Sequence, residues 1–104
     1  MNIIVNGVIL PEPATALTEW VTVAGQKLRQ LTISYDFASA TEAKIVLENA
    51  TKDPPLNLTY ITPHTNNNQT FPVQCHAAAA HVLREHNGAL QYAPLLVTLR
   101  EVVE

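Results

Sequence analysis

The sequence is poor in charged residues, and this shortage argues against nucleic-acid binding. Only 14% of its 104 residues are charged, against about 25% in an average globular domain. The six lysine and arginine residues are scattered along the chain, whereas a nucleic-acid-binding surface needs a basic patch or stripe. A neutral surface of this kind suits burial against partner proteins.

Cysteine, glycine and long apolar runs are also scarce. The single cysteine, Cys75, cannot form a disulfide within the chain, which fits a reducing compartment. The three glycines, Gly7, Gly25 and Gly88, lie too far apart for a phosphate-binding loop. The N-terminal residues lack the pattern of a signal peptide, and no apolar run reaches the ~20 residues of a membrane-spanning helix. We therefore expect a soluble protein, made in a cytoplasm, with no membrane partner.

Apolar and β-branched residues are densest at the two ends of the chain, which favours strands there. We expect these terminal runs to be strands of a sheet, or edges left open for another subunit. Asn6-Gly7 indicates either a tight hairpin or one strand with a bulge, and Pro94 can start the last strand. The predicted strands cover residues 2–10, 17–23, 28–35, 57–62, 70–75 and 95–103.

One helix is predicted over residues 40–50. Ser39 and Glu42 have the spacing of a capping box, in which each side chain bonds the backbone N–H of the other residue. Ala43, Val46, Leu47 and Ala50 then follow at helical spacing, and Asp53-Pro54-Pro55 stops the helix.

Residues 76–88 support two alternatives. Four consecutive alanines followed by a glycine stop favour a helix. The flanking runs are rich in strand residues, and Asn87-Gly88 is also a hairpin signal. Both alternatives stay open at this point.

The pattern as a whole predicts one domain, residues 1–104, of the α+β class. It is expected to be mostly antiparallel β, a small sandwich or partly open barrel with one packed helix. The predicted core residues are Ile4, Val8, Leu10, Trp20, Val21, Leu31, Ile33, Val46, Leu47, Leu58, Tyr60, Val73, Leu96, Val97 and Leu99.

No catalytic residue, metal ligand or cofactor is predicted. His76, His81 and His86 recur every five residues, a spacing that suits a shared metal on neither a helix nor a strand. Cys75 and His76 are adjacent, so on a strand they point to opposite faces and cannot form a nucleophile–base pair. Asp36 and Glu42 face no second acidic cluster, and Glu42 already has a capping role.

The segment 63–70 is long, rich in amide side chains and uncharged. It separates two strand-like runs, so it is expected to be the tip of a hairpin. The tip is either a mobile, solvated loop or a surface that docks on a neighbouring subunit, where amide groups would bond the partner's backbone.

Four segments follow one another in an order that resembles small tail and baseplate proteins of tailed bacteriophages and prophages. They are Ile4-Val5-Asn6-Gly7-Val8 with Leu10-Pro11, Leu31-Thr32-Ile33-Ser34-Tyr35 leading into Ala40-Thr41-Glu42-Ala43, Leu58-Thr59-Tyr60 with Pro63 and a polar tip, and Leu96-Val97-Thr98-Leu99-Arg100-Glu101-Val102. The chain departs from that family at residues 75–88, where a strand–turn–strand is replaced by an alanine-rich stretch.

The resemblance implies a structural component of a virion tail: a tube, distal or baseplate ring subunit without enzymatic activity. Its partners would be other copies of itself, in a ring homo-oligomer, and other tail proteins, with assembly in the host cytoplasm. The residues expected at interfaces are Asn66, Asn67, Asn68 and Gln69 in the loop, and Ile3, Val5 and Val102 on the terminal strands. The alternatives are a free-standing protein-binding module and, less favoured, a metal- or thiol-dependent enzyme.

Overall fold

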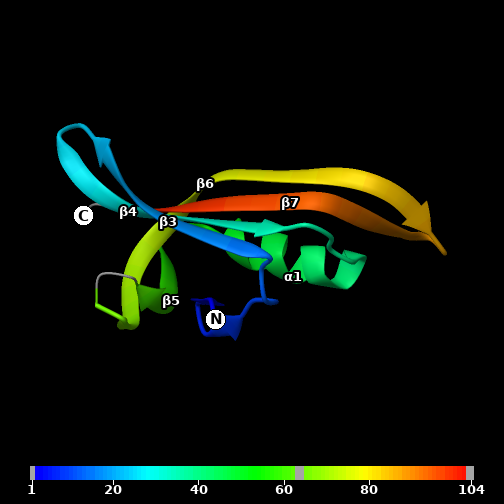
Figure 1. Cartoon of the computed structure of the whole chain (residues 1–104), viewed down its shortest axis with the longest axis horizontal. Coiled ribbons are helices and arrows are strands. Elements are labelled where there is room, and N and C mark those ends of the chain that lie inside the picture. The colour runs from blue at the N-terminus through cyan, green and yellow to red at the C-terminus, as the bar shows by residue number, and fades with distance from the viewer. Residues whose placement is uncertain (1, 63–64, 103–104) are drawn as a thin grey trace.

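The computed structural model describes residues 2–62 and 65–102, which form one seven-stranded sheet with a single helix (Figure 1). The strand order is β2-β1-β5-β6-β7-β4-β3, and every neighbouring pair is antiparallel. The predicted class is confirmed, with a single open sheet. The elements are β1 Ile4–Val5, β2 Val8–Ile9, β3 Thr15–Val23, β4 Gln26–Tyr35, α1 Ala40–Ala50, β5 Leu56–Thr62, β6 Asn67–His86 and β7 Ala89–Glu101.

Three of the hairpins close with a two-residue turn in which both residues have positive φ. The φ values are 50° and 81° at Asn6-Gly7, 50° and 81° at Ala24-Gly25, and 53° and 78° at Asn87-Gly88. Such turns match the right-handed twist of the flanking strands. Asn6-Gly7 therefore makes a hairpin between β1 and β2, not a bulge in one strand.

The ambiguous segment 76–88 is strand followed by a turn, not helix. It continues β6, which is 20 residues long, and pairs with β7, which is 13 residues long. Alanine prefers helix, but pairing with β7 overrides this local preference. β7 begins at Ala89, so Pro94 lies inside the strand and does not start it. Pro94 has no paired residue on β6, because the pairing of the two strands shifts at this point, between Ala80 and Val82.

The core lies between α1 and one face of the sheet. Ala43, Val46 and Ala50 of the helix are buried among residues of β4, β5, β6 and β7. The fully buried large side chains are Tyr60, Ile3, Leu31, Ile33, Leu56, Leu58, Leu95, Leu99, Val5, Val46, Val73 and Val97. Three predicted core residues, Val8, Trp20 and Leu96, are instead exposed. Leu96 points away from the helix because its neighbours Leu95 and Val97 face it.

The expectation of open edges at the chain ends is wrong for the C-terminal run. Over Leu95–Arg100, β7 is paired with β4 on one side and β6 on the other. At the N-terminus, β1 is paired with both β2 and β5. The margins of the sheet are therefore β2, which is two residues long, and β3, which is nine.

The start of α1 matches the predicted capping box. Ser39 Oγ accepts from the Glu42 backbone N–H at 3.2 Å, and Glu42 Oε1 accepts from the Ser39 backbone N–H at 3.3 Å. Tyr35, at the end of β4, donates its hydroxyl to the Pro11 carbonyl at 2.7 Å and so holds the segment before β3 against the sheet. Burial raises the pKa of this hydroxyl to about 12, so it stays a donor across the physiological range.

Replacing Ser39 by alanine should remove one acceptor for an end N–H of the helix. We expect S39A to lower the free energy of unfolding by about 1 kcal/mol, measured by urea denaturation. Thr41→Ala lies two residues later, in the first turn of the helix, and is exposed. It serves as the matched control and should change the free energy of unfolding by much less. An equal loss in both variants would contradict a specific capping role.

Candidate interaction surface

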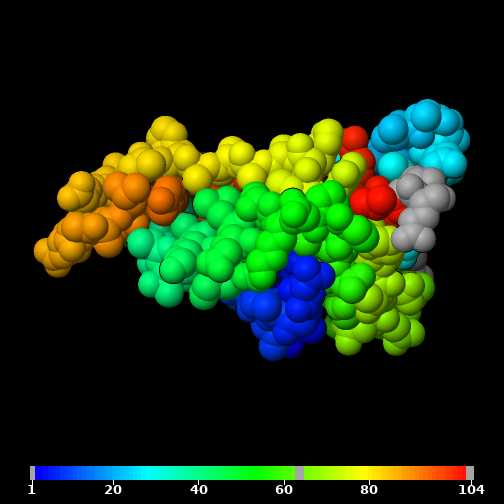
Figure 2. All heavy atoms as spheres, turned by 180° about the vertical axis from the view of Figure 1, so that it is seen from behind, coloured from blue at the N-terminus to red at the C-terminus, as the bar shows by residue number. Residues whose placement is uncertain are grey.

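The far part of the β6–β7 hairpin, residues 76–90, projects from the body of the protein, and we call it the arm. Every residue of the arm is exposed. It extends beyond the end of α1 at one extremity of the long axis (Figure 1), and Figure 2 shows its tip clear of the helix. The molecule measures 47 × 27 × 21 Å, and the arm accounts for much of its elongation.

The base of the arm is fixed to the body. Tyr92 N–H donates to the Ala38 carbonyl at 2.9 Å, and Ala38 N–H donates to the Tyr92 carbonyl at 2.8 Å. Ala38 is fully buried and Tyr92 packs against the core. The next residues of β7 toward the C-terminus pair with β4 from Leu95 onward. The arm therefore emerges from a rigid base.

Apolar side chains are exposed along the arm. The exposed fraction is 49% for Val82, 52% for Leu83 and 39% for Leu90. Val82 and Leu83 are consecutive and lie where the pairing of β6 with β7 shifts. A two-stranded ribbon alone in water is only marginally stable, and apolar groups exposed on one favour contact with a partner.

The outer edge of β6 is unpaired along the arm. β5 pairs with β6 only as far as Leu56 opposite Val73, and beyond that point β6 pairs solely with β7 within the described residues. The free stretch includes Ala77, Ala78, Ala79 and Ala80, whose small side chains leave the backbone accessible. An edge of this kind offers N–H and C=O groups to an incoming strand.

β3 forms the long margin of the sheet. Within the described part of the chain, β3 pairs with β4 alone, over Thr15–Val23. It contains no proline, and its only charged residue is Glu19. Natural sheets usually protect an edge with charges, proline or a short length. β3 has little of that protection in its sequence.

A row of polar side chains crosses the sheet face that α1 leaves uncovered. Glu19 on β3 accepts from the Gln30 amide at 2.9 Å, and Gln30 accepts from Arg100 Nε at 2.8 Å. Arg100 Nη2 lies 3.2 Å from His76 Nε2 at the base of the arm. This row links four strands, β3, β4, β7 and β6, and so fixes the marginal strand β3 relative to the base of the arm.

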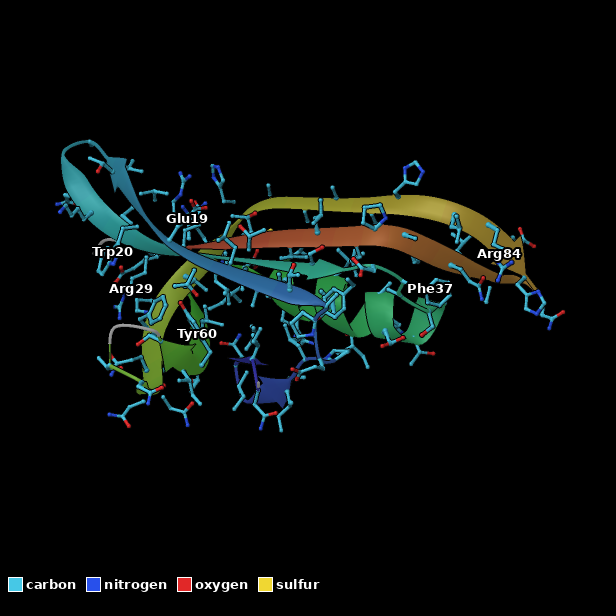
Figure 3. The ribbon with its side chains drawn as sticks, viewed as in Figure 1. Glu19, Trp20, Arg29, Phe37, Tyr60 and Arg84 are labelled. Atoms are coloured by element: carbon cyan, nitrogen blue, oxygen red, sulfur yellow. The ribbon has the colours of Figure 1, made fainter. Side chains whose placement is uncertain are left out.

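A second cluster joins β4 and β7 on the core face, at the end opposite to the arm. Arg29 Nη2 and Glu101 Oε2 are 2.7 Å apart, and the Arg29 backbone N–H also donates to Glu101 at 3.0 Å. The guanidinium lies 3.8 Å from the centre of the Phe71 ring. Figure 3 shows Arg29 at the end where Trp20 and Tyr60 lie, with Arg84 far away on the arm. The hydrogen bonds from Arg29 hold the pKa of Glu101 below its ordinary value.

The residues predicted at interfaces lie in different environments. The predicted hairpin tip, residues 63–70, is wrong at its second half: Asn67, Asn68 and Gln69 already belong to β6 and pair with β5, and of these amide residues only Asn66 lies in the turn. Asn66, Asn67 and Asn68 are exposed and Gln69 is half-buried. Residues 63 and 64 lie outside the described part. Ile3 and Val5 are fully buried in the core, so their side chains have no surface to offer a partner. Val102 is half-buried, and its N–H donates to the Pro72 carbonyl.

The histidines and the cysteine do not come together as a reactive centre in the described part of the chain. His76, His81 and His86 are exposed along β6, and residues 2–62 and 65–102 contain no group of three metal-binding side chains. Burial raises the pKa of the Cys75 thiol, which lowers the fraction of reactive thiolate.

The sequence reasoning missed the apolar residues of the arm, Val82, Leu83 and Leu90. The signal that could have found them was Asn87-Gly88, which fixes a hairpin and so places its flanking residues on a ribbon. Comparison with protein-family models, with curated proteins and with solved structures found no match. Among the described residues, no helix is long and apolar enough to cross a membrane.

The Arg29–Glu101 pair should make stability depend on pH. Because the pKa of Glu101 is lowered in the folded state, its stabilisation is present above the ordinary value of 4.5 and is lost as the pH falls through the folded value. We expect E101Q to lower the free energy of unfolding at pH 7 by about 1–2 kcal/mol. The difference from the unmodified protein should shrink in acid.

Denaturant unfolding at pH 7 and at successively lower pH checks this expectation. Glu48→Gln, an exposed position on α1, is the control and should leave stability nearly unchanged. A wild-type advantage over E101Q that persists undiminished in strong acid would show that the carboxylate charge is not what stabilises the contact.

Proposed function

We propose that this protein is a structural component of a bacteriophage tail, a ring subunit of the tube, distal or baseplate region that works by protein–protein assembly. The observation that carries the proposal is the arm: a fixed, projecting β-ribbon with exposed apolar residues on it. The segment order that resembles small tail and baseplate proteins gives the setting. The proposed partners are further copies of the chain and neighbouring tail proteins, and the proposed location is the virion.

An exposed ribbon is costly unless something covers it. Val82, Leu83 and Leu90 expose apolar surface whose burial would be worth about 25 cal/mol per Å². The anchored base at Ala38 and Tyr92 already holds the ribbon in place, so little ordering entropy remains to be lost on binding. These features support an element built to insert against another protein.

Two different surfaces at opposite ends favour a ring over a symmetric dimer. The arm projects at one end of the long axis and the β3–β4 hairpin at the other (Figure 1). When one surface of a subunit binds a different surface of the next copy, the contact is heterologous, and repetition closes a ring or extends a filament. Low overall charge, 14% of residues, permits close approach of identical subunits.

The first test is the oligomeric state and the location of the protein. We expect light scattering after size exclusion to give closed rings at micromolar concentration, or co-assembly with tail proteins expressed from the neighbouring genes. Mass spectrometry of purified virions should find the chain in the particle. A protein that stays monomeric alone and with those neighbours, and is absent from virions, would be a free-standing module, and the proposal would fail.

A pair of variants tests the role of the arm. Leu83→Ser combined with Val82→Ser should weaken assembly by about tenfold or more in concentration, because each serine removes apolar area from the contact. Ile9→Ser changes an apolar residue on β2 that is even more exposed, far from the arm in the sheet order, and is the control. Equal weakening by both, or by neither, would argue against an arm-mediated contact.

A further inference from the structure

We propose that the free edge of β6 pairs with the same edge of a second copy of the chain, antiparallel and about a twofold axis at Ala79. In this pairing Ala78 of each copy lies opposite Ala80 of the other, and the two Ala79 residues lie opposite each other. The contact goes beyond the proposed function and does not depend on it. It is supported by the regularity of the free edge, the direction of its backbone groups and the absence of charge around it.

The edge is regular over residues 77–80. These residues pair one to one with residues 95–98 of β7, and the register shifts lie outside them, between Cys75 and Ala77 and beyond Ala80. Their side chains are exposed, so the helix does not cover them. β6 (yellow) forms the upper margin of the molecule along this stretch in both views (Figures 1 and 2). A second strand can therefore approach it from outside.

The direction of the backbone groups can be followed across the sheet, starting from β3. The Ala14 N–H donates to the Ser34 carbonyl at 2.8 Å, so Ser34 and alternate residues of β4 direct their groups toward β3. Ile33, between them, bonds β7, where it pairs with Val97. Leu96, the neighbour of Val97, therefore directs its groups to the other side, toward β6.

The same alternation assigns the groups of β6. Leu96 pairs with Ala79, so Ala79 directs its N–H and C=O toward β7. Ala78 and Ala80, on either side of it, direct theirs away from the sheet. The Val102 N–H also donates to β6, and its even separation from Leu96 along β7 gives the same assignment.

An edge with two such residues is complementary to its own copy. When two copies pair antiparallel about Ala79, the N–H and C=O of Ala78 meet the C=O and N–H of Ala80 in the other copy. The twofold axis generates the same exchange a second time. Ala79 then faces its copy in a non-hydrogen-bonded pair, in which the two strands come closest.

The side chains around the axis carry no charge. Residues 77–80 are all alanine, and residues 95–98 opposite them on β7 are two leucines, a valine and a threonine. Edge strands are usually protected from pairing by charges or proline, and this stretch has neither. Leu96, which is 38% exposed and pairs with Ala79, adds apolar surface beside the contact.

Pairing of two β3 strands with each other is less favourable. Glu19 lies at the centre of β3, so a symmetric antiparallel pair centred there places two carboxylates opposite each other, which is destabilising. Trp20, the next residue, already makes an interaction within the chain. The edge of β6 is therefore the better candidate for a twofold contact.

A twofold contact is compatible with a ring. Contacts between different surfaces close a ring, and a twofold contact can join a copy in one ring to a copy in a second ring, which gives dihedral symmetry. In a protein that forms no ring, the same contact gives a dimer.

Disulfide trapping tests the pairing directly. In a Cys75→Ala background, we expect Ala79→Cys to form a disulfide-linked homodimer under mild oxidation. The reason is that a non-hydrogen-bonded pair brings its two Cα atoms to about 4.5 Å, within the range that a disulfide spans.

Ala77→Cys in the same background is the matched control. Ala77 is an exposed alanine on the same strand, two residues before Ala79 and on the same face of the sheet. In the proposed register it lies opposite His81 of the other copy, so its own copy is out of reach. It should give about a tenth as much homodimer or less.

A pair of charge variants keeps the test independent of cysteine chemistry. Ala79→Lys and Ala79→Glu each place like charges opposite each other on the axis, so each alone should associate about two- to fivefold more weakly than the unmodified protein. An equimolar mixture should recover the association, because opposite charges then face each other. Sedimentation velocity measures the association, and an unchanged melting temperature confirms that each variant is folded. A mixture that associates as weakly as either variant would overturn the pairing.

The outcomes separate this inference from the proposed function. If the unmodified protein assembles but Ala79→Cys gives no homodimer, or Ala77→Cys links equally well, the pairing is wrong and the assembly role stands. If Ala79→Cys links and the charge mixture recovers, but the protein forms no ring and is absent from virions, the pairing stands and the proposed function fails. A protein that is monomeric at all concentrations, alone and with the neighbouring tail proteins, contradicts both.

Discussion

Every backbone N–H and C=O group in a strand needs a partner, and the unequal strand lengths of this protein leave β6 beyond Val73 with a neighbouring strand on one side only, within the described residues. β5 accompanies β6 only as far as Val73, while β6 continues to His86. β3 has a neighbour on one side only. The other features of the surface follow from this constraint. The arm projects because β6 and β7 extend beyond the strands and the helix beside them. Its apolar side chains are exposed because no neighbouring element covers them.

The body of the protein supplies what such an arm needs, a base that does not move. The buried residues Leu95, Val97 and Leu99 fix β7 against the core beneath the arm. Two backbone hydrogen bonds between Ala38 and Tyr92 fix β7 where the arm leaves the body. At the other end, Arg29 and Glu101 join β4 to β7, and the row from Glu19 to His76 connects the same strands on the uncovered face. The arm and the marginal strand β3 are thus held in one rigid frame.

Local signals predicted the elements that depend on few residues. The helix at 40–50 was predicted because Ser39 and Glu42 cap it within one turn, and the first hairpin because Asn6-Gly7 closes it within two residues. The alanine run was ambiguous because its state depends on Leu95–Leu99, far along the chain, and composition carries no information about that pairing. Trp20 was predicted in the core but is exposed. The reason is that β3 is an edge strand lying beyond the helix-covered part of the sheet.

The candidate surface was predicted less well than the fold. The low charge led us to expect assembly through strand edges, and we assigned these edges to the ends of the chain. In the structure, β7 is an interior strand of the sheet, and Ile3 and Val5 are buried. Which strand becomes an edge is set by the order of strands in the sheet. That order depends on crossovers such as β4–α1–β5, and spacing along the sequence does not reveal it.

Amide hydrogen exchange measured below and above the concentration of assembly tests the central claim most directly, because it reports on the backbone groups themselves. The account predicts that peptides covering residues 77–85 of the arm become protected on assembly, while the β2 edge and the β5–β6 turn keep their exchange rates. If oligomers form and the arm exchanges as fast as in the monomer, the arm does not hold the assembly together and the account is wrong.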